Sequence, residues 1–366
     1  MAVPLLDLKR QYNKIKERID KAVQEVFDNG YFILGPPVAD LEKRVAELCR
    51  VDYGVGVASG TDALLLSVIA AGVKPGDEVI TSDYSFFAST SVISRAGAVP
   101  KFVDIEEDTY NIDPTLIEKT ITPKTKAIIP VHLFGQVADM EPIMEIARKY
   151  GLVVIEDAAQ AISARYKDRP AGSIGDYGCF SFYPSKNLGG VGDGGLVVTK
   201  TEENYEMLKM LRLHGWKQKY RPLVVGYNSR LDSLQAAVLL IKLDYLDEWS
   251  QGRIANAKKY DAAFAGTAIK TPVVREYSYH IYNQYTIAVE NRDELMTALK
   301  ENKIGHDIYY PVPFHQLECY KYLPYKTGDF PISEKAAANV VSIPIFPELT
   351  DEEQEEVISV VKSVSA

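Results

Sequence analysis

A lysine in an unusual local setting is the first candidate for chemistry in this sequence. Lys186 follows the aromatic run Phe180–Tyr183 and precedes a cluster of glycines at 189–195. A lysine amine can form a Schiff base with an aldehyde and can then move a proton at the neighbouring carbon. Most lysines are solvated surface charges, but aromatic residues and glycines surround this one in the sequence. Lys186 is therefore our candidate catalytic residue.

An acid and two polar turns elsewhere in the chain complement this amine. Asp157 ends an apolar run, and Gly60 and Thr61 lie between a strand-like run and a helical one. Backbone N–H groups at a helix N-terminus bind phosphate, and the Ser181 hydroxyl would add to them. The plainer alternatives are a capping role for Asp157 and simple helix capping by the turn near Gly60. An amine, a carboxylate and two anion-binding turns are the parts that hold pyridoxal 5'-phosphate (PLP), so we interpret the chain as a PLP enzyme.

The remaining cofactor contacts follow from this interpretation. Asp157 would face the pyridine nitrogen and keep it protonated, which makes the ring an electron sink. Glu156 precedes Asp157, but alternation along a strand sends the two side chains to opposite faces. Gln160 is a candidate donor to the ring oxygen, and Phe86 is a candidate for stacking on the ring. For Gln160 the alternative is an ordinary loop position, and for Phe86 it is core packing.

The elements that must position these residues alternate between residues 53 and 199. Short apolar strands interleaved with helical patterns predict an α/β fold with a largely parallel sheet covered on both faces. In such sheets ligands bind beyond the carboxyl ends of the strands, and Gly60, Asp157 and Ser181 lie at or near such ends in different strands. The predicted strands are Tyr53–Ala58, Glu78–Thr81, Pro100–Asp104, Ala127–Val131, Leu152–Glu156, Gly178–Phe182 and Gly195–Thr199.

The composition changes in the last third of the chain. Arg230–Phe264 reads as a long helix, which we expect to break near Gly252. Tyrosine, proline and β-forming residues then follow from Thr271, with a closing helix from Asp351. At 366 residues, two domains are expected. We predict a large PLP-binding α/β domain at 1–250, including N-terminal helices, and a smaller α+β domain at 251–366.

Composition and missing motifs exclude several other functions. The formal charge of −9 argues against a nucleic-acid surface, and no run reaches the roughly 18 apolar residues of a membrane span. Three scattered cysteines and the absence of a signal pattern favour the cytoplasm. The five histidines lack metal-site spacing, so no metal is expected. Gly190–Gly195 fits GxGxxG, but a strand-like run follows it instead of a helix, which argues against a dinucleotide enzyme.

Several motifs, in order along most of the chain, resemble those of the DegT/DnrJ/StrS family of PLP-dependent sugar aminotransferases. They are Asp7-Leu8, Ser59–Leu64, Pro75–Ile80, Thr122–Ile128, Ile155–Gln160, Phe180–Phe182 with Lys186, Gly192–Gly195 and Asn228–Asp232. The ordered set is specific, although each piece alone is not. The resemblance implies the fold-type I aminotransferase architecture and a homodimer with two shared active sites.

The resemblance also implies a role for each candidate residue. Lys186 would bear the Schiff base, with Asp157 at the ring nitrogen, Gln160 at the ring oxygen, Phe86 on the ring face, and Gly60, Thr61 and Ser181 on the phosphate. Asn228 would reach the phosphate of the neighbouring subunit's cofactor, and Arg230 would lie near the shared substrate cleft. Many relatives read His-Tyr-Pro where this chain has Tyr309-Tyr310-Pro311. Tyr309, His214 and His315 are the further candidates on the substrate side.

The expected substrate is a nucleotide-linked keto-hexose, with glutamate as the amino donor. The segment Val225–Ala237 looks like the branch that acts at carbon 3 of the sugar, and action at carbon 4 is the alternative. Some relatives replace the lysine with histidine and perform dehydration, so retention of Lys186 favours transamination. Two further functions stay open at this point, a PLP-dependent sugar dehydratase or lyase and a non-catalytic PLP-binding regulator.

Overall fold

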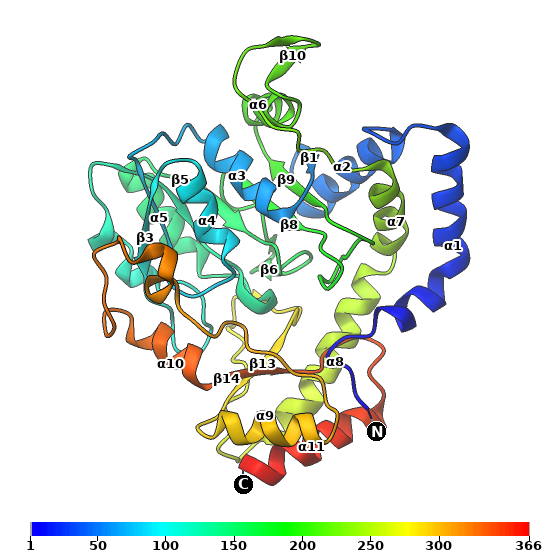
Figure 1. Ribbon diagram of the computed structural model, residues 1–366, viewed down its shortest axis with the longest axis vertical. Helices are drawn as coiled ribbons and strands as arrows, with labels where there is room; N and C mark the ends of the chain where they lie inside the picture. Colours follow the sequence, from blue (N-terminus) through cyan, green and yellow to red (C-terminus); the bar gives the residue numbers. More distant parts are fainter. Residues whose placement is uncertain (1, 366) are drawn as a thin grey trace.

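A seven-stranded sheet in the order β1-β9-β8-β5-β4-β2-β3 forms the centre of the structure, a computed structural model that describes residues 2–365 (Figure 1). Every strand is parallel to its neighbours except β9, which runs antiparallel to both β1 and β8. The largely parallel sheet is confirmed, with strand ends shifted by a residue or two from prediction. The strands are β1 Tyr53–Val57, β2 Glu78–Ser82, β3 Val99–Val103, β4 Thr125–Ile129, β5 Val153–Asp157, β8 Tyr177–Ser181 and β9 Gly195–Thr199.

Helices cover both faces of this sheet because its strands are apolar on both sides. On β5, Val154 belongs to the core shared with α2, α5 and α7, whereas Ile155 belongs to the core shared with α3, α4 and α6. Both cores consist of nearly fully buried side chains, so successive residues of one strand contact different helical layers. The helices are α2 Pro36–Cys49, α3 Gly60–Ala70, α4 Ala88–Arg95, α5 Met140–Tyr150, α6 Glu202–Arg212 and α7 Ser233–Leu243.

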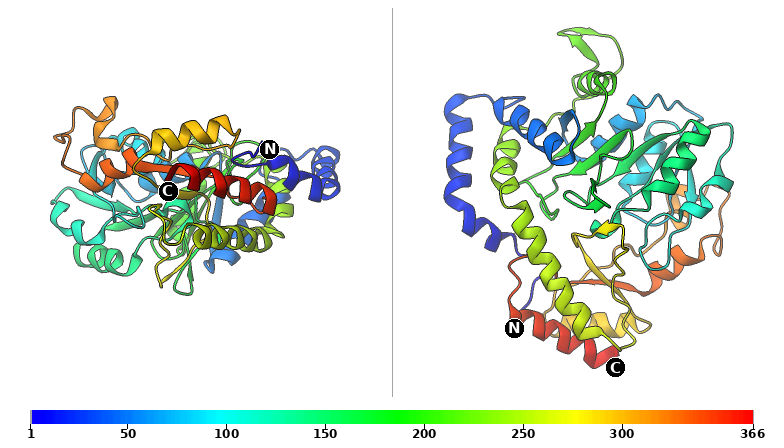
Figure 2. Two further views of the ribbon diagram at one scale, coloured as in Figure 1. Left: turned by 90° about the horizontal axis from the view of Figure 1, so that it is seen from below. Right: turned by 180° about the vertical axis from the view of Figure 1, so that it is seen from behind.

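The helix predicted over Arg230–Phe264 is two helices in the structure, and the predicted break near Gly252 is wrong. The turn lies at Asp244-Tyr245, between α7 and α8 (Leu246–Phe264), and Gly252 is inside α8. A Cβ at Gly252 would lie 3.2 Å from the Cα of Pro347. The glycine therefore permits close packing instead of ending the helix. The back view shows α8 running from the large sheet to the C-terminal part, with α1 (Leu8–Asn29) lying to one side of the molecule (Figure 2).

The C-terminal part is α+β, as predicted. Strands β13 (Tyr285–Ala288) and β14 (Val340–Ile343) pair antiparallel, and they pack with α8, α9 (Arg292–Glu301) and α11 (Asp351–Ser365) around a separate core. The chain crosses between the cores more than once. Val3 is buried in the C-terminal core, whereas Phe314 packs on Phe102 of β3. The boundary near residue 250 stays a prediction.

Smaller elements complete the fold and were not foreseen in the sequence. Strands β10 and β11 form a hairpin that projects from the body (Figure 1), and β12 adds to a small sheet with β6 and β7. No helix among residues 2–365 has the length and apolar character needed to cross a membrane. The additional elements are β6 Arg165–Tyr166, β7 Arg169–Pro170, β10 Trp216–Gln218, β11 Arg221–Pro222, β12 Ser278–Tyr279, α10 Pro331–Asn339 and five 3-10 turns between residues 114 and 320.

Candidate active site

The reversed direction of β9 brings two of the predicted turns together. Gly195 begins β9 and pairs with Val57 at the end of β1 and with Ser181 at the end of β8. A Cβ at Gly195 would lie 2.4 Å from the carbonyl carbon of Ser59, and one at Gly60 would lie 2.6 Å from the Cβ of Ser181. Glycine is therefore required at both positions. The turn after β1 and the end of β8 consequently form one compact cradle.

This cradle opens on the N-terminus of α3. Ser59 caps the helix, since its Oγ accepts a 3.0 Å hydrogen bond from the N–H of Asp62. The N–H groups of Gly60 and Thr61 belong to the first turn, where a helix has no acceptor of its own. Capping by Ser59 and an anion site are therefore compatible, and the positive end of the helix dipole favours a phosphate here.

Asp157 ends β5 as a buried carboxylate. Its Oδ2 accepts a 2.7 Å hydrogen bond from the Ser89 hydroxyl, and its Oδ1 accepts one of 3.2 Å from the N–H of Ala159. Burial raises the pKa of Asp157, while these donors and the amine of Lys186 oppose that rise. Burial likewise lowers the pKa of Lys186 to about 8, and Asp157 opposes that fall. The structure thus brings the predicted amine and acid within electrostatic reach of each other.

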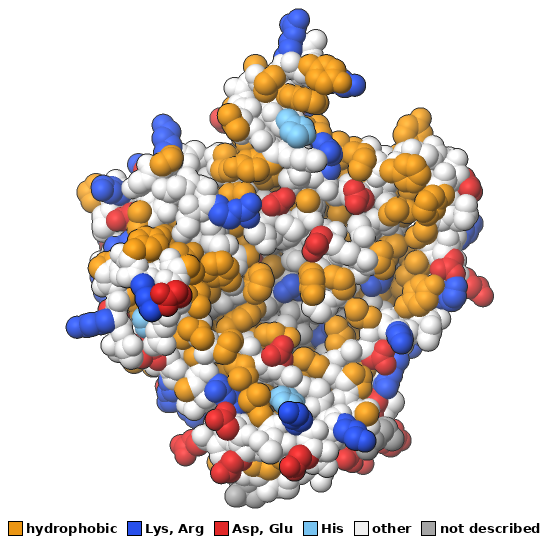
Figure 3. All heavy atoms as spheres, viewed as in Figure 1, with side chains coloured by type: hydrophobic (Ala, Val, Ile, Leu, Met, Phe, Trp, Pro, Cys, Tyr) orange, Lys and Arg blue, Asp and Glu red, His pale blue; other side chains and the backbone are white. Residues whose placement is uncertain are grey.

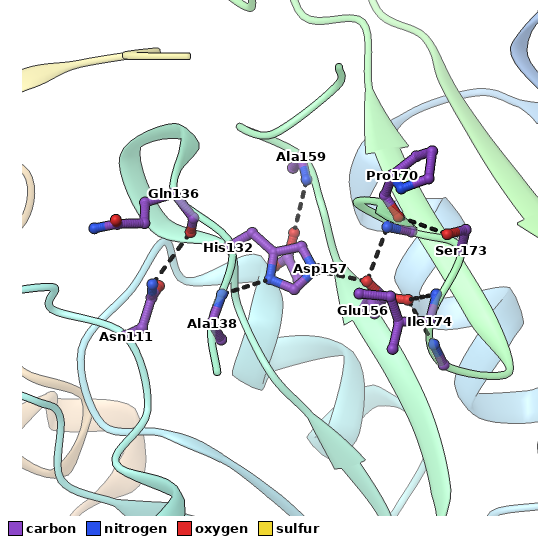
Figure 4. A network of polar contacts seen from close by, with 12 residues as sticks. Asn111, His132, Gln136, Ala138, Glu156, Asp157, Ala159, Pro170, Ser173 and Ile174 are labelled. Carbon is purple, nitrogen blue, oxygen red and sulfur yellow. Dashed lines mark hydrogen bonds and ion pairs between the residues drawn. The ribbon is translucent and has the colours of Figure 1, made fainter. Parts of the chain in front are cut away.

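Glu156 points to the other face of the sheet, as the alternation along β5 predicted. Its two oxygens accept hydrogen bonds of 2.6 to 2.8 Å from the backbone N–H groups of Gly172, Ile174 and Gly175 (Figure 4). The Nδ1 of His132 accepts from the N–H of Ala138, so its Nε2 donates the 2.8 Å bond to Glu156. The hydrogen-bonding capacity of Glu156 is used within the fold, which leaves Asp157 as the acid on the cradle side.

Gln160 is held in one orientation beside a tyrosine that the sequence reasoning missed. Its Oε1 accepts a 2.6 Å bond from the N–H of Phe134, so its Nε2 points toward the hydroxyl of Tyr310 at 3.1 Å. Tyr84 secures Tyr310, because its hydroxyl accepts from the N–H of Tyr310 at 2.6 Å. The ring of Phe86 lies 6.1 Å from the Tyr310 ring and is 55% exposed, so it retains an open face. The pair of adjacent tyrosines was a sequence signal, but it did not show which of the two contacts Gln160.

The segment that carries Lys186 is anchored on both sides. Asn187 donates to the carbonyl of Ile281 at 3.2 Å, which ties the segment to the C-terminal part of the chain. Helix α7 supplies the other anchors, which are a 2.7 Å bond from Lys242 Nζ to the carbonyl of Gly189 and a 2.8 Å bond from the N–H of Val191 to Gln235 Oε1. The position of the amine is therefore set by two other elements.

Two of the substrate-side candidates lie on the C-terminal part of the chain. Tyr309 is partly buried, and burial raises its pKa to about 12. His315 is almost fully buried, with its Nδ1 2.6 Å from Oδ2 of Asp83 and its Nε2 3.2 Å from Oε1 of Glu334. Burial raises the pKa of Asp83 to about 6 against the effect of His315. These contacts give His315 a structural task, and its role toward a substrate stays a prediction.

His214 and Asn228 flank the projecting hairpin in the sequence, and Arg230 lies two residues before Asp232, the N-cap of α7. His214 is exposed, and its ring lies against that of Trp216 in a tilted arrangement with centroids 5.3 Å apart. Asn228 is exposed in the segment that follows the hairpin. Arg230 has a buried Nε without a hydrogen-bond partner within residues 2–365. Over that same range, neither His214 nor Asn228 has a hydrogen bond or ring contact to the residues around Lys186.

Hydrophobic side chains gather across the middle of the face shown in Figure 3. The exposed aromatic side chains of the described residues include Phe86 and Tyr183, each 55% exposed. An amine of lowered pKa, a buried acid and a glycine cradle at the carboxyl ends of a mostly parallel sheet are typical of PLP-dependent enzymes. Sequence comparison places the chain more closely. It belongs to the DegT/DnrJ/EryC1/StrS aminotransferase family, whose profile matches residues 13–362.

Two relatives span nearly the whole chain. The chain is similar to a protein of Geobacillus stearothermophilus called a pleiotropic regulatory protein, with 47% identity over 98% of this chain and 97% of that protein. It is also similar to a UDP-N-acetyl-3-dehydro-alpha-D-glucosamine 3-aminotransferase of Acidithiobacillus ferrooxidans, with 42% identity over 99% of this chain and 97% of that enzyme. The predicted family is confirmed.

Solved structures agree with this placement. S. venezuelae DesV, crystallised in complex with a ketimine intermediate, superposes with a TM-score of 0.97 at 43% identity, over 100% of this chain and 98% of that one. The ntda protein of Bacillus subtilis, crystallised with bound cofactor PMP, gives a TM-score of 0.92 at 35% identity, over 99% and 85% of the two chains. The predicted fold-type I architecture is therefore confirmed.

Proposed function

We propose that this chain is a PLP-dependent aminotransferase that converts a nucleotide-linked 3-keto hexose to the corresponding amino sugar. The observation that carries the proposal is the pairing of Lys186 with Asp157 beside the Gly60–Ser181 cradle. Burial lowers the pKa of the lysine to about 8, which makes its neutral, nucleophilic form available near physiological pH. The sugar chemistry follows from relatives such as the A. ferrooxidans 3-aminotransferase.

The residues present fit this cofactor. A Cβ at Gly60 would fill the cradle and clash with Ser181 at 2.6 Å, so the glycine leaves open the place where backbone N–H groups can meet a phosphate. Gly60, Thr61 and Ser181 would hold that phosphate. Phe86 would cover one face of the ring, and Gln160 would contact the ring oxygen. When bound, PLP supplies an electron sink for the electrons of a breaking C–H bond.

Asp157 and Lys186 would control different protons at this site. Asp157 would favour a proton on the ring nitrogen of the bound cofactor, because an ionised carboxylate in a buried site favours a cationic partner. The Nζ of Lys186 would hold the cofactor through its aldehyde, and the same amine, when neutral, would serve as the base that moves a proton at the substrate carbon. Gln160 cannot rotate freely, because Phe134 fixes its Oε1. The Nε2 of Gln160 is thus the end of this side chain that would face a bound ring oxygen.

Glutamate is proposed as the amino donor, with 2-oxoglutarate released before the keto-sugar binds. Two covalent half-reactions predict ping-pong kinetics. Contacts to the distant nucleotide supply orientation at the reacting carbon. His214, Tyr309, Arg230 and His315 remain the proposed substrate-side residues. The segment Val225–Ala237 resembles the family branch that acts at carbon 3 of the sugar, which supports amination at carbon 3 over carbon 4.

We also propose a cytoplasmic homodimer with shared active sites. The hairpin and its continuation expose large hydrophobic side chains, with Tyr220, Leu223 and Val225 exposed at 74%, 66% and 91%. Such exposure on a projecting segment marks a contact surface, and a twofold dimer is the commonest arrangement. In that dimer Asn228 of one subunit would reach the phosphate bound by the other.

A direct assay separates this function from a different sugar chemistry. The purified enzyme is given glutamate and a panel of nucleotide keto-sugars, and the aminated carbon is identified by NMR. We expect an amino group at carbon 3 together with 2-oxoglutarate. Amination at carbon 4 would show that the chain is a 4-keto-sugar aminotransferase. A product mass reduced by one water would show that it is a dehydratase.

A PLP-binding regulator is the second candidate function, because a 47% identical relative bears the name of a regulatory protein. A regulator would retain the visible absorbance of bound PLP when glutamate is added, since no half-reaction would occur. An aminotransferase would lose that absorbance and release 2-oxoglutarate. The same sample therefore distinguishes the two candidates before any sugar is tested.

A further inference from the structure

A serine that no sequence motif singled out contacts the acid of the site. Ser89 lies in the first turn of α4 and is fully buried. Its Oγ is 2.7 Å from Oδ2 of Asp157 and 3.1 Å from the Oγ of Ser85. The carbonyl of Phe86 is a second possible acceptor for the Ser89 hydroxyl, also at 3.1 Å. These contacts place Ser89 between two neighbouring groups of its own turn and the carboxylate.

The direction of these hydrogen bonds follows from the chemistry of the groups. An ionised carboxylate can only accept, so Ser89 donates its single proton to Asp157. The shorter distance and the charge on the acceptor favour this bond over the one to the Phe86 carbonyl. The Ser85 hydroxyl can then donate to the free lone pairs of Ser89. The result is a chain of hydroxyls, Ser85 to Ser89 to Asp157, that ends on the carboxylate.

The two oxygens of Asp157 are therefore fixed by different elements. Ser89 of α4 holds Oδ2, and the N–H of Ala159 holds Oδ1. Each oxygen keeps lone-pair capacity for a further donor. Burial acts against the ionised form of this carboxylate, and the Ser89 hydroxyl is the first contact that opposes it. Removing this donor would leave a buried charge with less compensation.

We infer that Ser89 is a positioning residue for Asp157, which orients the carboxylate and keeps it ionised for a protonated ring nitrogen. The inference rests on the role proposed for Asp157. Phe86, the proposed stacking residue, is three positions earlier on the same turn, so the start of α4 sets both the ring face and the acid. A shift of this turn would disturb both contacts together.

A double-mutant cycle on cofactor binding tests the inference. The variants are Ser89→Ala, Asp157→Asn and the double variant, and the readout is the dissociation constant for PLP. The Ser89–Asp157 bond also exists without the cofactor, so only the part of its strength gained on binding enters the dissociation constant. A hydrogen bond to a charged group contributes about 1.5–3 kcal/mol, so Ser89→Ala should weaken PLP binding measurably but by less than about a hundredfold. In the Asp157→Asn background the serine change should have little further effect, because its charged acceptor is gone. Equal effects in both backgrounds would overturn the inference.

A spectroscopic readout separates positioning from general damage. A charge on the ring nitrogen disfavours a second positive charge on the nitrogen that joins Lys186 to the cofactor. Ser89→Ala should therefore raise the pH at which the visible absorbance of bound PLP changes, in the same direction as Asp157→Asn but by less. Ser94→Ala is the matched control, because Ser94 lies on the same helix and contacts Tyr320 instead of Asp157.

The outcomes distinguish the two levels of the proposal. If Asp157→Asn changes both PLP affinity and the pH of the absorbance change but Ser89→Ala changes neither, the inference about Ser89 is wrong. If Asp157→Asn leaves both unchanged, the proposed role of Asp157 fails first. A parallel loss of affinity in Ser94→Ala would point to disruption of α4 as a whole and would also count against the inference.

Discussion

At the scale of single residues, burial shifts the pKa of both the amine and the acid, and each group partly offsets the shift of the other. Lys186 loses part of its solvation through burial, and Asp157 restores part of the stability of its charged form. A lysine with a pKa of about 8 is neutral in about a fifth of molecules at pH 7.4, compared with roughly one in a thousand for an ordinary lysine. The cofactor-free chain is thus prepared for attack on an aldehyde.

The pH dependence of PLP attachment should report this preparation. Only the neutral amine attacks the aldehyde, so the attachment rate should rise with pH and level off above about 8. Stopped-flow absorbance on the cofactor-free chain measures the rate. A free lysine derivative under the same conditions controls for titration of PLP itself and should continue to rise toward about 10.4. Identical profiles for protein and derivative would contradict the lowered pKa.

The buried His280 should make stability depend on pH. Burial lowers the pKa of His280 in the folded chain to about 4 from its ordinary value of 6.5. Between about pH 4 and pH 6.5 the unfolded chain therefore binds a proton that the folded chain does not bind. The contribution of the neutral side chain is therefore complete above 6.5 and is lost as the pH falls. Its Nδ1 accepts from the N–H of Tyr282, and the variant His280→Asn retains an acceptor there.

Urea unfolding of the two proteins tests this sign. From pH 7 to pH 5 the wild type should lose roughly 2 kcal/mol of unfolding free energy relative to His280→Asn. Using the difference between the variants removes the contribution of the other titrating groups. A difference that stays constant, or that grows in favour of the wild type on acidification, would show that His280 is not held neutral.

At the scale of elements, α7 acts as a support for the lysine segment. Lys242 is buried on this helix, and its Nζ donates a hydrogen bond to the carbonyl of Gly189. Gln235 of the same helix accepts a hydrogen bond from the N–H of Val191. Lys242→Met should leave that carbonyl unsatisfied and loosen residues 186–191. We expect hydrogen exchange at Val191 to rise about tenfold and PLP affinity to fall by a similar factor, since a lost charged hydrogen bond is worth about 1.5 kcal/mol or more.

Lys259→Met on α8 is the control for this prediction, because Lys259 forms an exposed ion pair with Asp351. Exposed pairs contribute little, so exchange in the lysine segment should stay unchanged. Unaltered exchange at Val191 in Lys242→Met would show that the anchor does not govern the segment.

The elements also show what a sequence can predict. Each strand of the large sheet was visible in its own apolar run, and the opposite directions of Glu156 and Asp157 follow from local geometry. The break between α7 and α8 was misplaced because the role of Gly252 depends on Pro347, which is far away in the sequence. Ser89 and Tyr310 escaped notice for the same reason. Their importance comes from contacts to Asp157 and Gln160 that only the folded chain creates.

At the scale of the whole molecule, the proposed dimer would complete each site with a residue of the other subunit. Lys186→Ala and Asn228→Ala should each lower activity strongly when alone. Mixed by co-refolding or co-expression, the two variants should regain about one quarter of wild-type activity, because half of the dimers are mixed and each has one intact site. Steady-state turnover of the mixture measures this.

The recovery depends on subunit exchange, which analytical ultracentrifugation of differently tagged subunits can verify. Two copies of the same variant provide the control and should regain nothing. If mixed dimers form without any recovery of turnover, Asn228 acts within its own subunit and the sites are not shared.

The antiparallel pairing of Ser181 with Gly195 has a consequence for how this fold can change. The reactive segment leaves the sheet after Ser181 and re-enters it at Gly195, which is the residue directly opposite on the neighbouring strand. Residues 182–194 therefore form a loop whose two ends are fixed beside each other. Insertions or deletions inside this loop need not alter the register of either strand. The residues near the amine can therefore change in type and number during evolution, while Ser181 and Gly195, which form part of the phosphate cradle, keep their places in the sheet.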